Sequence, residues 1–322
     1  MKKSLIIGLI LLFLITAVFI IKPEKKKNLN EIRLAEVTHS VFYAPLYVAI
    51  EKGYFEDEGI KIDLTLVSGA DKVSAAVLSN DVEIGFAGPE ATIYIYKANE
   101  EDYLMSFAGL TKRDGQFIVG RKKEDLDLND LKGKEIVVGR KGGMPALNFL
   151  NALDNENISE KDININYSID YSALSGAFIS GIGDYVNLFE PNATKLEEQG
   201  LGYIVSSIGK HSSVVPYTAF FARKSYIENN KEIIKKFRNA INKGLKFVKD
   251  NNEEEIANAI TKQFNDISIN ELKIIVKRYK DNDSWFDNTF ISEEAYKNLE
   301  DIIIKANLLD KYVDYNKLVI NE

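Results

Sequence analysis

Residues 78–92, LSNDVEIGFAGPEAT, and residues 180–194, SGIGDYVNLFEPNAT, share one layout: a turn of small residues, a strand-like run, and a helix opened by proline. Proline is tolerated in the first turn of a helix, because the N–H that it lacks has no partner there. The four prolines in this context are Pro45, Pro89, Pro145 and Pro191. The first two are 44 residues apart and the last two 46, which favours two similar lobes over a chance likeness of α/β units.

Strand-like and helix-like runs alternate through most of the chain, which predicts an α/β fold with parallel sheets. From Tyr226 onward the pattern is helical, and these helices are expected to pack on the first lobe as a C-terminal extension. We therefore predict a two-lobed fold with a discontinuous first lobe, residues 28–112 plus 217–322, and a second lobe, residues 113–216. The two crossings between the lobes, near residues 111–116 and 215–220, are expected to form a hinge.

The N-terminus carries an apolar run, residues 4–21, that contains no charge and has lysines on both sides. Its 18 residues are at the lower edge for a transmembrane helix and long for a signal-peptide core. Ile15 fits poorly at the −3 position of the one tolerable cleavage site, after Ala17. We expect residues 1–27 to be an uncleaved anchor that holds the protein at the outer face of the cytoplasmic membrane. The alternative is a cleaved signal and secretion.

The rest of the chain is acidic: without residues 1–27 it has 35 basic and 47 acidic residues, a net charge of −12. This charge, without a basic stripe, argues against a nucleic-acid partner. The chain has no cysteine, which excludes disulfides, thiolate metal sites and lipoprotein processing. No cofactor or metal ion is expected, because no His, Asp or Glu cluster has ligand spacing. A chain of this length can form an ordinary hydrophobic core, and we expect a monomer.

Few residues suggest catalysis. The chain has two histidines, His39 and His211, and it lacks a nucleophile elbow, a phosphate loop and a Rossmann fingerprint. Glu90 and Glu190 both lie at turns beside expected helix N-termini. They suit either general acid–base chemistry, a ligand that donates hydrogen bonds, or a plain role as helix caps. A binding cleft explains the pattern better than an enzyme does.

The expected cleft lies where several helix N-termini meet the carboxyl ends of the strands. Glycines there allow backbone N–H groups to approach a ligand closely, and aromatic residues at the same level, among them Phe42 and Phe189, suit a flat ligand. Arg113, Arg140 and Lys141 would suit an anion instead, so the charge of the ligand stays open. The candidate ligand-binding residues are Ser40, Tyr43, Gly69, Ala70, Asp71, Gly88, Glu90, Gly142, Gly143, Met144, Glu190 and Tyr217.

Three segments together resemble a known family: YAPLYVAIEKGYFEDEGI (43–60), GADKVSAAVLSNDVEIGFAGPEA (69–91) and DLKGKEIVVGRKGG (130–143). They are similar to extracytoplasmic solute-binding proteins of ABC importers, in the branch that binds nitrate, sulfonates, taurine and thiamine-pyrimidine precursors. The resemblance covers nearly all of residues 31–250. It implies a periplasmic-binding-protein-like fold that traps a small solute between two lobes and delivers it to a permease with an ATPase.

The resemblance also assigns ligand contacts to the candidate residues by their matching turns. The chain departs from the family pattern by lacking the lipid-anchor cysteine, for which the apolar N-terminus would substitute. Enzymes share this fold, but a thiamine-pyrimidine synthase relative carries a cysteine-rich motif that this chain lacks. The resemblance therefore implies a transport protein and not an enzyme. An enzyme or a ligand sensor that has kept the fold is the alternative.

Overall fold

The structure, a computed structural model, describes residues 29–321. The expected membrane segment, residues 4–21, lies outside these residues. Among the residues that are described, no helix is long and apolar enough to cross a membrane.

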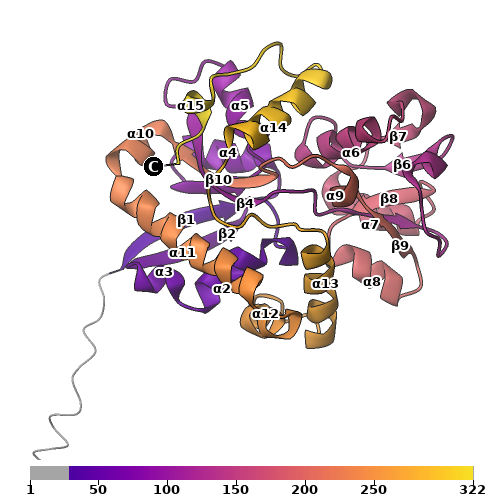
Figure 1. Cartoon of the computed structure of the whole chain (residues 1–322), viewed down its shortest axis with the longest axis horizontal. Coiled ribbons are helices and arrows are strands. Elements are labelled where there is room, and N and C mark those ends of the chain that lie inside the picture. The colour runs from indigo at the N-terminus through magenta and orange to yellow at the C-terminus, as the bar shows by residue number, and fades with distance from the viewer. Residues whose placement is uncertain (1–28, 322) are drawn as a thin grey trace, which may run out of the picture.

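Two five-stranded sheets form the centres of two lobes that lie side by side (Figure 1). The sheet of lobe I has the order β2-β1-β3-β10-β4, and that of lobe II has the order β7-β6-β8-β5-β9. The strands of lobe I are β1 (Asn30–Glu36), β2 (Ile60–Leu66), β3 (Ile84–Ala87), β4 (Leu104–Thr111) and β10 (Thr218–Arg223). Those of lobe II are β5 (Phe117–Gly120), β6 (Glu135–Val137), β7 (Asn164–Asn166), β8 (Tyr185–Leu188) and β9 (Tyr203–Ser207).

The two sheets have the same plan. In each, three neighbouring strands are parallel and the fourth strand in the order, β10 or β5, is antiparallel to both of its neighbours. This antiparallel strand is the one that enters from the other lobe. The chain therefore crosses twice between the lobes, at residues 112–116 and 212–217, and we call these two segments the hinge.

Helices cover the sheets. In lobe I they are η1 (Val41–Tyr43), α2 (Ala44–Glu51), α3 (Tyr54–Asp57), α4 (Ala70–Leu78) and α5 (Glu90–Lys97). Lobe II has η2 (Leu128–Leu131), α6 (Met144–Asn155), η3 (Glu160–Asp162), η4 (Tyr171–Ala173), α7 (Leu174–Ile179), α8 (Asn192–Glu198) and α9 (Ile208–His211). The C-terminal part has α10 (Lys224–Asn229), α11 (Lys231–Asp250), α12 (Glu253–Ile260), η5 (Thr261–Gln263), α13 (Ile269–Asp281), α14 (Glu293–Lys305) and α15 (Tyr315–Leu318).

The prolines begin helices as the sequence predicts, in two slightly different ways. Pro45 and Pro145 lie within the first turn of α2 and α6, whereas Pro89 and Pro191 directly precede α5 and α8. At all four positions the missing N–H falls where a helix has no partner for it. Helix N-termini from both lobes are thereby brought to the region between the sheets.

The C-terminal helices pack on lobe I, and two of them, α13 and α14, also reach lobe II. Helix α11 buries an apolar face and lies against α2. Gly244 makes this close packing possible, because a Cβ at that position would lie 2.1 Å from the Pro45 carbonyl oxygen. Helix α13 extends further, since its Arg278 forms ion pairs with Glu190 and Glu197 of lobe II. The extension therefore contacts both lobes, and the sequence pattern gives no sign of the second contact.

Candidate ligand-binding site between the two lobes

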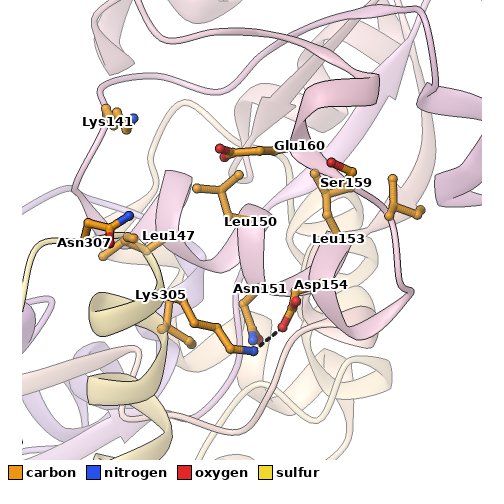
Figure 2. Close-up of a pocket in the computed structure, with 13 residues that line it drawn as sticks. Lys141, Leu147, Leu150, Asn151, Leu153, Asp154, Ser159, Glu160, Lys305 and Asn307 are labelled. Carbon is orange, nitrogen blue, oxygen red and sulfur yellow. Dashed lines mark hydrogen bonds and ion pairs between the residues drawn. The ribbon is translucent and has the colours of Figure 1, made fainter.

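The structure has a cavity of about 270 Å³ between α6 and α14, on the outer side of the contact between the lobes (Figure 2). Lys305 of α14 forms an ion pair with Asp154 of α6 across it. A second cavity, of about 310 Å³, lies along α11. None of the candidate ligand-binding residues lines either cavity. The candidate site must be sought instead among the packed side chains between the lobes.

Glu90, Gly88 and Met144 meet at the contact between the lobes. Glu90 begins α5 of lobe I, and Met144 begins α6 of lobe II. A Cβ added to Gly88 would lie 2.0 Å from Glu90 Oε2 and 2.5 Å from Met144 Cγ. Only glycine fits between these two side chains, so three predicted site residues lie in one place.

The Glu90 carboxyl group is buried and pairs with no cation of residues 29–321. The side chain is 3% exposed, and no hydrogen bond to its Oε2 is found among the described residues. Burial raises the pKa of Glu90 from 4.5 to about 7, while the N–H groups of Glu90, Met144 and Ala91 moderate the rise. A buried carboxyl oxygen without a partner is costly, and such groups mark functional sites in clefts.

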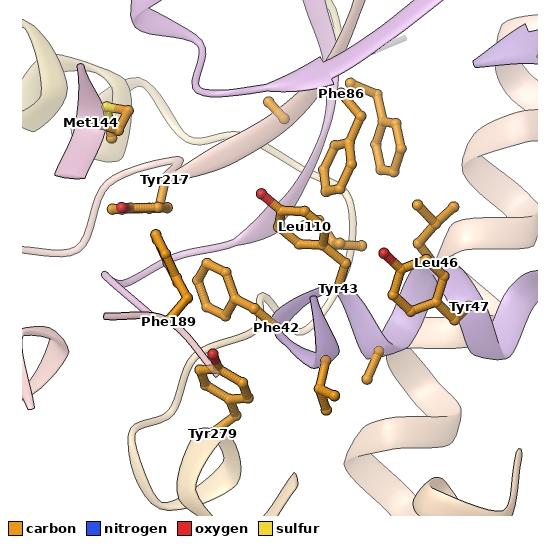
Figure 3. Close-up of a cluster of buried hydrophobic side chains, with 14 of the residues drawn as sticks. Phe42, Tyr43, Leu46, Tyr47, Phe86, Leu110, Met144, Phe189, Tyr217 and Tyr279 are labelled. Atoms are coloured by element: carbon orange, nitrogen blue, oxygen red, sulfur yellow. The ribbon is translucent and has the colours of Figure 1, made fainter. Parts of the chain in front are cut away.

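Aromatic rings form a buried cluster near Met144 (Figure 3). Glu90 is close enough to two of them, Tyr43 and Tyr217, to add to the rise in pKa that burial causes in their phenols. The Phe42 ring lies 5.6 Å from both Tyr43 and Phe189, 5.7 Å from Tyr217 and 5.1 Å from Tyr279, measured between centroids. Phe42 and Tyr43 come from lobe I and Phe189 from lobe II, while Tyr217 lies on the second hinge segment. The structure therefore brings together the aromatic residues that the sequence assigns to a flat ligand.

Ser40 also lies between the lobes, but it serves a contact within the protein. Its Oγ donates a hydrogen bond to the Glu190 carbonyl oxygen at 2.7 Å and accepts one from Phe42 N at 3.3 Å. Glu190 N in turn donates to the Tyr279 hydroxyl at 3.1 Å. These bonds join the N-terminal side of η1 to the turn before α8.

Glu190 has the structural role that the sequence left open as an alternative. Its Oε1 pairs with Arg278 Nη1 at 2.8 Å, and its Oε2 accepts from Thr194 N at 2.8 Å, inside the first turn of α8. The same Arg278 group donates to Thr194 Oγ1 at 2.6 Å. Both carboxylate oxygens are thus occupied. This side chain caps α8 and anchors α13, and its ligand contact stays a prediction.

The segment from Gly69 to Asp71 lies at the exposed rim of the contact between the lobes. Asp71 Oδ1 is 3.7 Å from Arg140 Nη2 of lobe II, and Arg140 Nε is 3.5 Å from Asp170 Oδ1. Ala70 is the first residue of α4, directly after Gly69, which has a φ of +112°. All of these charges are well exposed, so they are screened by solvent.

The two adjacent glycines before α6 differ in conformation. Gly142 has a φ of +90°, which favours glycine, and its carbonyl oxygen accepts a hydrogen bond at 3.1 Å from Tyr94 of lobe I. Gly143 has a φ of −85°, and an added Cβ would meet nothing closer than 3.7 Å. The prediction that both are needed for a close backbone approach has a conformational basis at Gly142 only.

His39, one of the two histidines of the chain, has both ring nitrogens occupied. Nδ1 lies 2.7 Å from Glu36 Oε1, and Nε2 lies 2.9 Å from the Gln263 carbonyl oxygen. The Glu36 bond raises the pKa of His39 against the opposing effect of burial, which is the largest single influence. Within residues 29–321, no group of three or more His, Cys, Asp or Glu side chains is placed to hold a metal ion.

Three buried polar residues near the hinge are absent from the candidate set: Asp114, Gln116 and Asn187. None has any solvent exposure, and each has at least one side-chain atom for which the described part of the chain provides no hydrogen bond. Burial raises the pKa of Asp114 well above its usual range, while its neighbour Gln116 N and the Tyr217 hydroxyl partly oppose this rise. The sequence gives little indication of this site, because residues 111–117, TKRDGQF, have the composition of a polar turn between the lobes.

Two α/β lobes of the same plan, joined by two crossings and enclosing buried polar and aromatic groups, define the fold of a solute-binding protein of ABC importers. The chain belongs to the NMT1/THI5-like family, whose model matches residues 41–255. It is 39% identical over 313 residues to YtlA of Bacillus subtilis (strain 168), whose name describes it as a binding protein. That match covers 97% of this chain and 93% of YtlA.

Solved structures confirm the fold class. The alkanesulfonate-binding protein SsuA from Xanthomonas axonopodis pv. citri, bound to MOPS, has a TM-score of 0.70 at 17% identity. The match covers 91% of this chain and 98% of SsuA. A partial relative is the 4-amino-5-hydroxymethyl-2-methylpyrimidine phosphate synthase of Aspergillus parasiticus, 32% identical over 98 residues, or 30% of this chain and 28% of the synthase. The family predicted from the three sequence segments is thereby confirmed.

Proposed function

We propose that this protein is the solute-binding component of an ABC importer and that it captures a small nitrogen heterocycle between its lobes. The observation that supports this most strongly is the buried Glu90 carboxyl group at the contact between the lobes, whose Oε2 has no hydrogen-bond partner within residues 29–321. A ligand N–H group would supply a hydrogen bond to this oxygen. The bond would favour the ionised carboxylate and so lower the raised pKa of Glu90, and a hydrogen bond to the ionised form is a strong one.

The charges of the site favour a donor-bearing ligand over a sulfonate- or nitrate-type anion. Two buried carboxyl groups, those of Glu90 and Asp114, lie next to the aromatic cluster without an ion pair among the described residues, whereas the third, Glu190, pairs with Arg278. Among the cations that the sequence suggests for an anion, Arg140 is exposed and lies between Asp71 and Asp170. An anion placed beside Glu90 would raise the pKa of its carboxyl group further, whereas an amino-substituted ring would favour the ionised form.

The aromatic cluster suits a flat ring. Phe42, Tyr43, Phe189 and Tyr217 are contributed by both lobes and by the hinge, so only the closed arrangement surrounds a ligand on all sides. A ligand that contacts both lobes shifts the population toward that arrangement. We propose this as the mechanism of capture, with Tyr43 and Tyr217 against the faces or edges of the ring and Glu90 on its amino group.

The cellular arrangement follows from the same proposal. Residues 4–21 would anchor the protein at the outer face of the cytoplasmic membrane, and the closed form would be presented, as a monomer, to a permease with its ATPase. The remaining predicted site residues, from Gly69 to Asp71 and from Gly142 to Met144, would form the rim through which the solute enters.

A thermal-shift screen of the full-length protein in detergent tests the proposal. The panel contains 4-amino-5-hydroxymethyl-2-methylpyrimidine, taurine, an alkanesulfonate and nitrate. A ligand at about 100 times its Kd adds roughly 2.7 kcal/mol of stability. The pyrimidine is expected to stabilise the wild type, and Glu90→Gln should weaken its binding by roughly 1.5–3 kcal/mol. A response to the anions alone would refute the proposed ligand class.

A second candidate is an enzyme on the same fold, which the partial match to the Aspergillus synthase suggests. The two are separated by recovering the ligand after incubation. A binding protein returns the pyrimidine unchanged and in stoichiometric amount, whereas an enzyme converts it. Chemical change of the recovered compound would therefore replace the transport proposal.

A further inference from the structure

Four polar side chains without solvent exposure lie at the hinge or on the adjoining elements of lobe II, and each has an atom without a hydrogen-bond partner in the part of the chain that the structure describes. The atoms are both amide atoms of Gln116, both amide atoms of Asn187, Asn148 Oδ1, and Asp114 Oδ2, which lies near enough to the Tyr217 hydroxyl for that group to lower the pKa of Asp114. Buried polar groups in folded proteins are nearly always hydrogen-bonded, to protein or to another bound group. A concentration of six such atoms therefore requires an explanation.

The strand register places Gln116 and Asn187 on one face of the sheet of lobe II. Gln116 N donates to Asp114 Oδ1 at 2.6 Å, which fixes the turn that leads into β5. In the ladder, Ile118 of β5 lies opposite Asn187 of β8. Because side chains alternate between the faces of a strand, Gln116 shares a face with Ile118 and therefore with Asn187. Ile118 belongs to the same apolar cluster as Phe149, so this face is the one that α6 covers.

The hinge group is continuous with the site around Glu90. Asn148 lies one turn after Met144 on α6, and its Nδ2 donates to the Met144 carbonyl oxygen at 3.1 Å. Met144 contacts the Gly88–Glu90 corner from the other side. Tyr217 joins the two ends as well, because its phenol interacts electrostatically with both Asp114 and Glu90. Met144 and Tyr217 thus connect the residues that carry unpartnered atoms with the site around Glu90.

We infer that Asp114, Gln116, Asn187 and Asn148 form an inner subsite that binds the far end of the captured solute. This inference rests on the proposed function and extends it. The amides of Gln116 and Asn187 each offer a donor and an acceptor, Asn148 adds an acceptor, and the protonated carboxyl group of Asp114 can donate or accept. The group that satisfies them is uncharged and both donates and accepts hydrogen bonds, as a hydroxymethyl or amide group does. The ring then lies in the aromatic cluster, with its amino group at Glu90.

The location of the subsite gives it a role in closure. Asp114 and Gln116 lie on or beside the first hinge segment, and Tyr217 ends the second. A solute end bound there contacts the segments whose backbone changes when the lobes move. Binding at this end therefore favours one hinge conformation directly, in addition to the contacts that the lobes make with the ring.

Two probes that differ at one end test the inference: 4-amino-5-hydroxymethyl-2-methylpyrimidine and 4-amino-2,5-dimethylpyrimidine, which lacks the hydroxyl. Affinities are measured by calorimetry on the full-length protein. The wild type is expected to prefer the hydroxymethyl compound at least tenfold, because loss of the hydroxyl leaves buried groups unpaired. Asn187→Leu should reduce this preference to near unity. Glu90→Gln, at the opposite end, should weaken both compounds and keep the preference.

A preference that survives in Asn187→Leu, or that is absent in the wild type, overturns the inner subsite while the proposed function stands. If neither pyrimidine binds the wild type, the proposed ligand class fails. The inner subsite is then tested by comparing the thermal midpoint of Asn187→Leu with that of the wild type, both without ligand. A midpoint equal to or above that of the wild type supports an amide without internal partners. A loss of several degrees shows that the hinge amides are structural, held by buried water, and overturns the inference.

Discussion

Replacing Glu90 by glutamine should change how the free energy of unfolding depends on pH. A neutral substitution on the surface should leave this pH dependence nearly unchanged. The folded protein binds the Glu90 proton more tightly than the unfolded chain, since burial raises the pKa of this group from 4.5 to about 7. Its contribution to stability is therefore fully present below about pH 4.5 and is lost as the pH rises through about 7. At about 1.4 kcal/mol per pH unit, the loss amounts to about 3 kcal/mol.

The assay is urea unfolding of the wild type and of Glu90→Gln at several pH values from 4.5 to 7.5, followed by circular dichroism. The glutamine keeps the shape of the side chain and has no proton to lose in this range. The free energy of unfolding of the wild type, minus that of the variant, should fall by about 3 kcal/mol across the series. Taking this difference cancels the titration of the other groups that the two proteins share.

Glu58→Gln provides a control of opposite sign. The hydrogen bond from Lys243 lowers the pKa of Glu58, so its stabilising contribution appears as the pH rises and is lost in acid. A difference between wild type and Glu90→Gln that stays flat from pH 4.5 to 7.5 would refute the reasoning. It would mean that the carboxyl group has a partner in solution or is open to water.

The remaining predictions concern the turns on either side of the site. Arg278→Ala should cost about 3–5 kcal/mol in urea unfolding, because it leaves the fully buried Glu190 carboxylate without its ion pair. Glu190→Gln in the same chain should recover much of that loss, and an unchanged loss in the double variant would contradict the pairing. The exposed neighbour Lys277→Ala, which breaks only an i,i+4 pair, should cost less than about 0.5 kcal/mol. Gly142→Ala should lower the free energy of unfolding by about 1–3 kcal/mol, because alanine is strained at a φ of +90°. Gly143→Ala should leave the thermal midpoint nearly unchanged, since φ is −85° there. Equal effects of the two substitutions would show that the backbone angle φ does not determine the loss of stability.

The sequence by itself determined the elements and the class of fold. Strand-like runs, helix-opening prolines and the apolar face of α11 are local patterns, and each follows from backbone geometry or from burial of one face. The repeat of the pattern after about 100 residues predicts two lobes of one plan. These features, with the three segments that resemble a family, identify a binding protein without any tertiary contact.

Only the tertiary structure separated Glu90 from Glu190, which look alike in the sequence because each adjoins a proline at a helix N-terminus. Arg278, 88 residues further along the chain, reaches Glu190 and occupies its carboxylate, whereas no cation among the described residues pairs with Glu90. The hinge residues Asp114 and Asn187 likewise gain their importance from burial. Partners and solvent exposure are properties of residues distant in sequence, so a local pattern cannot determine them.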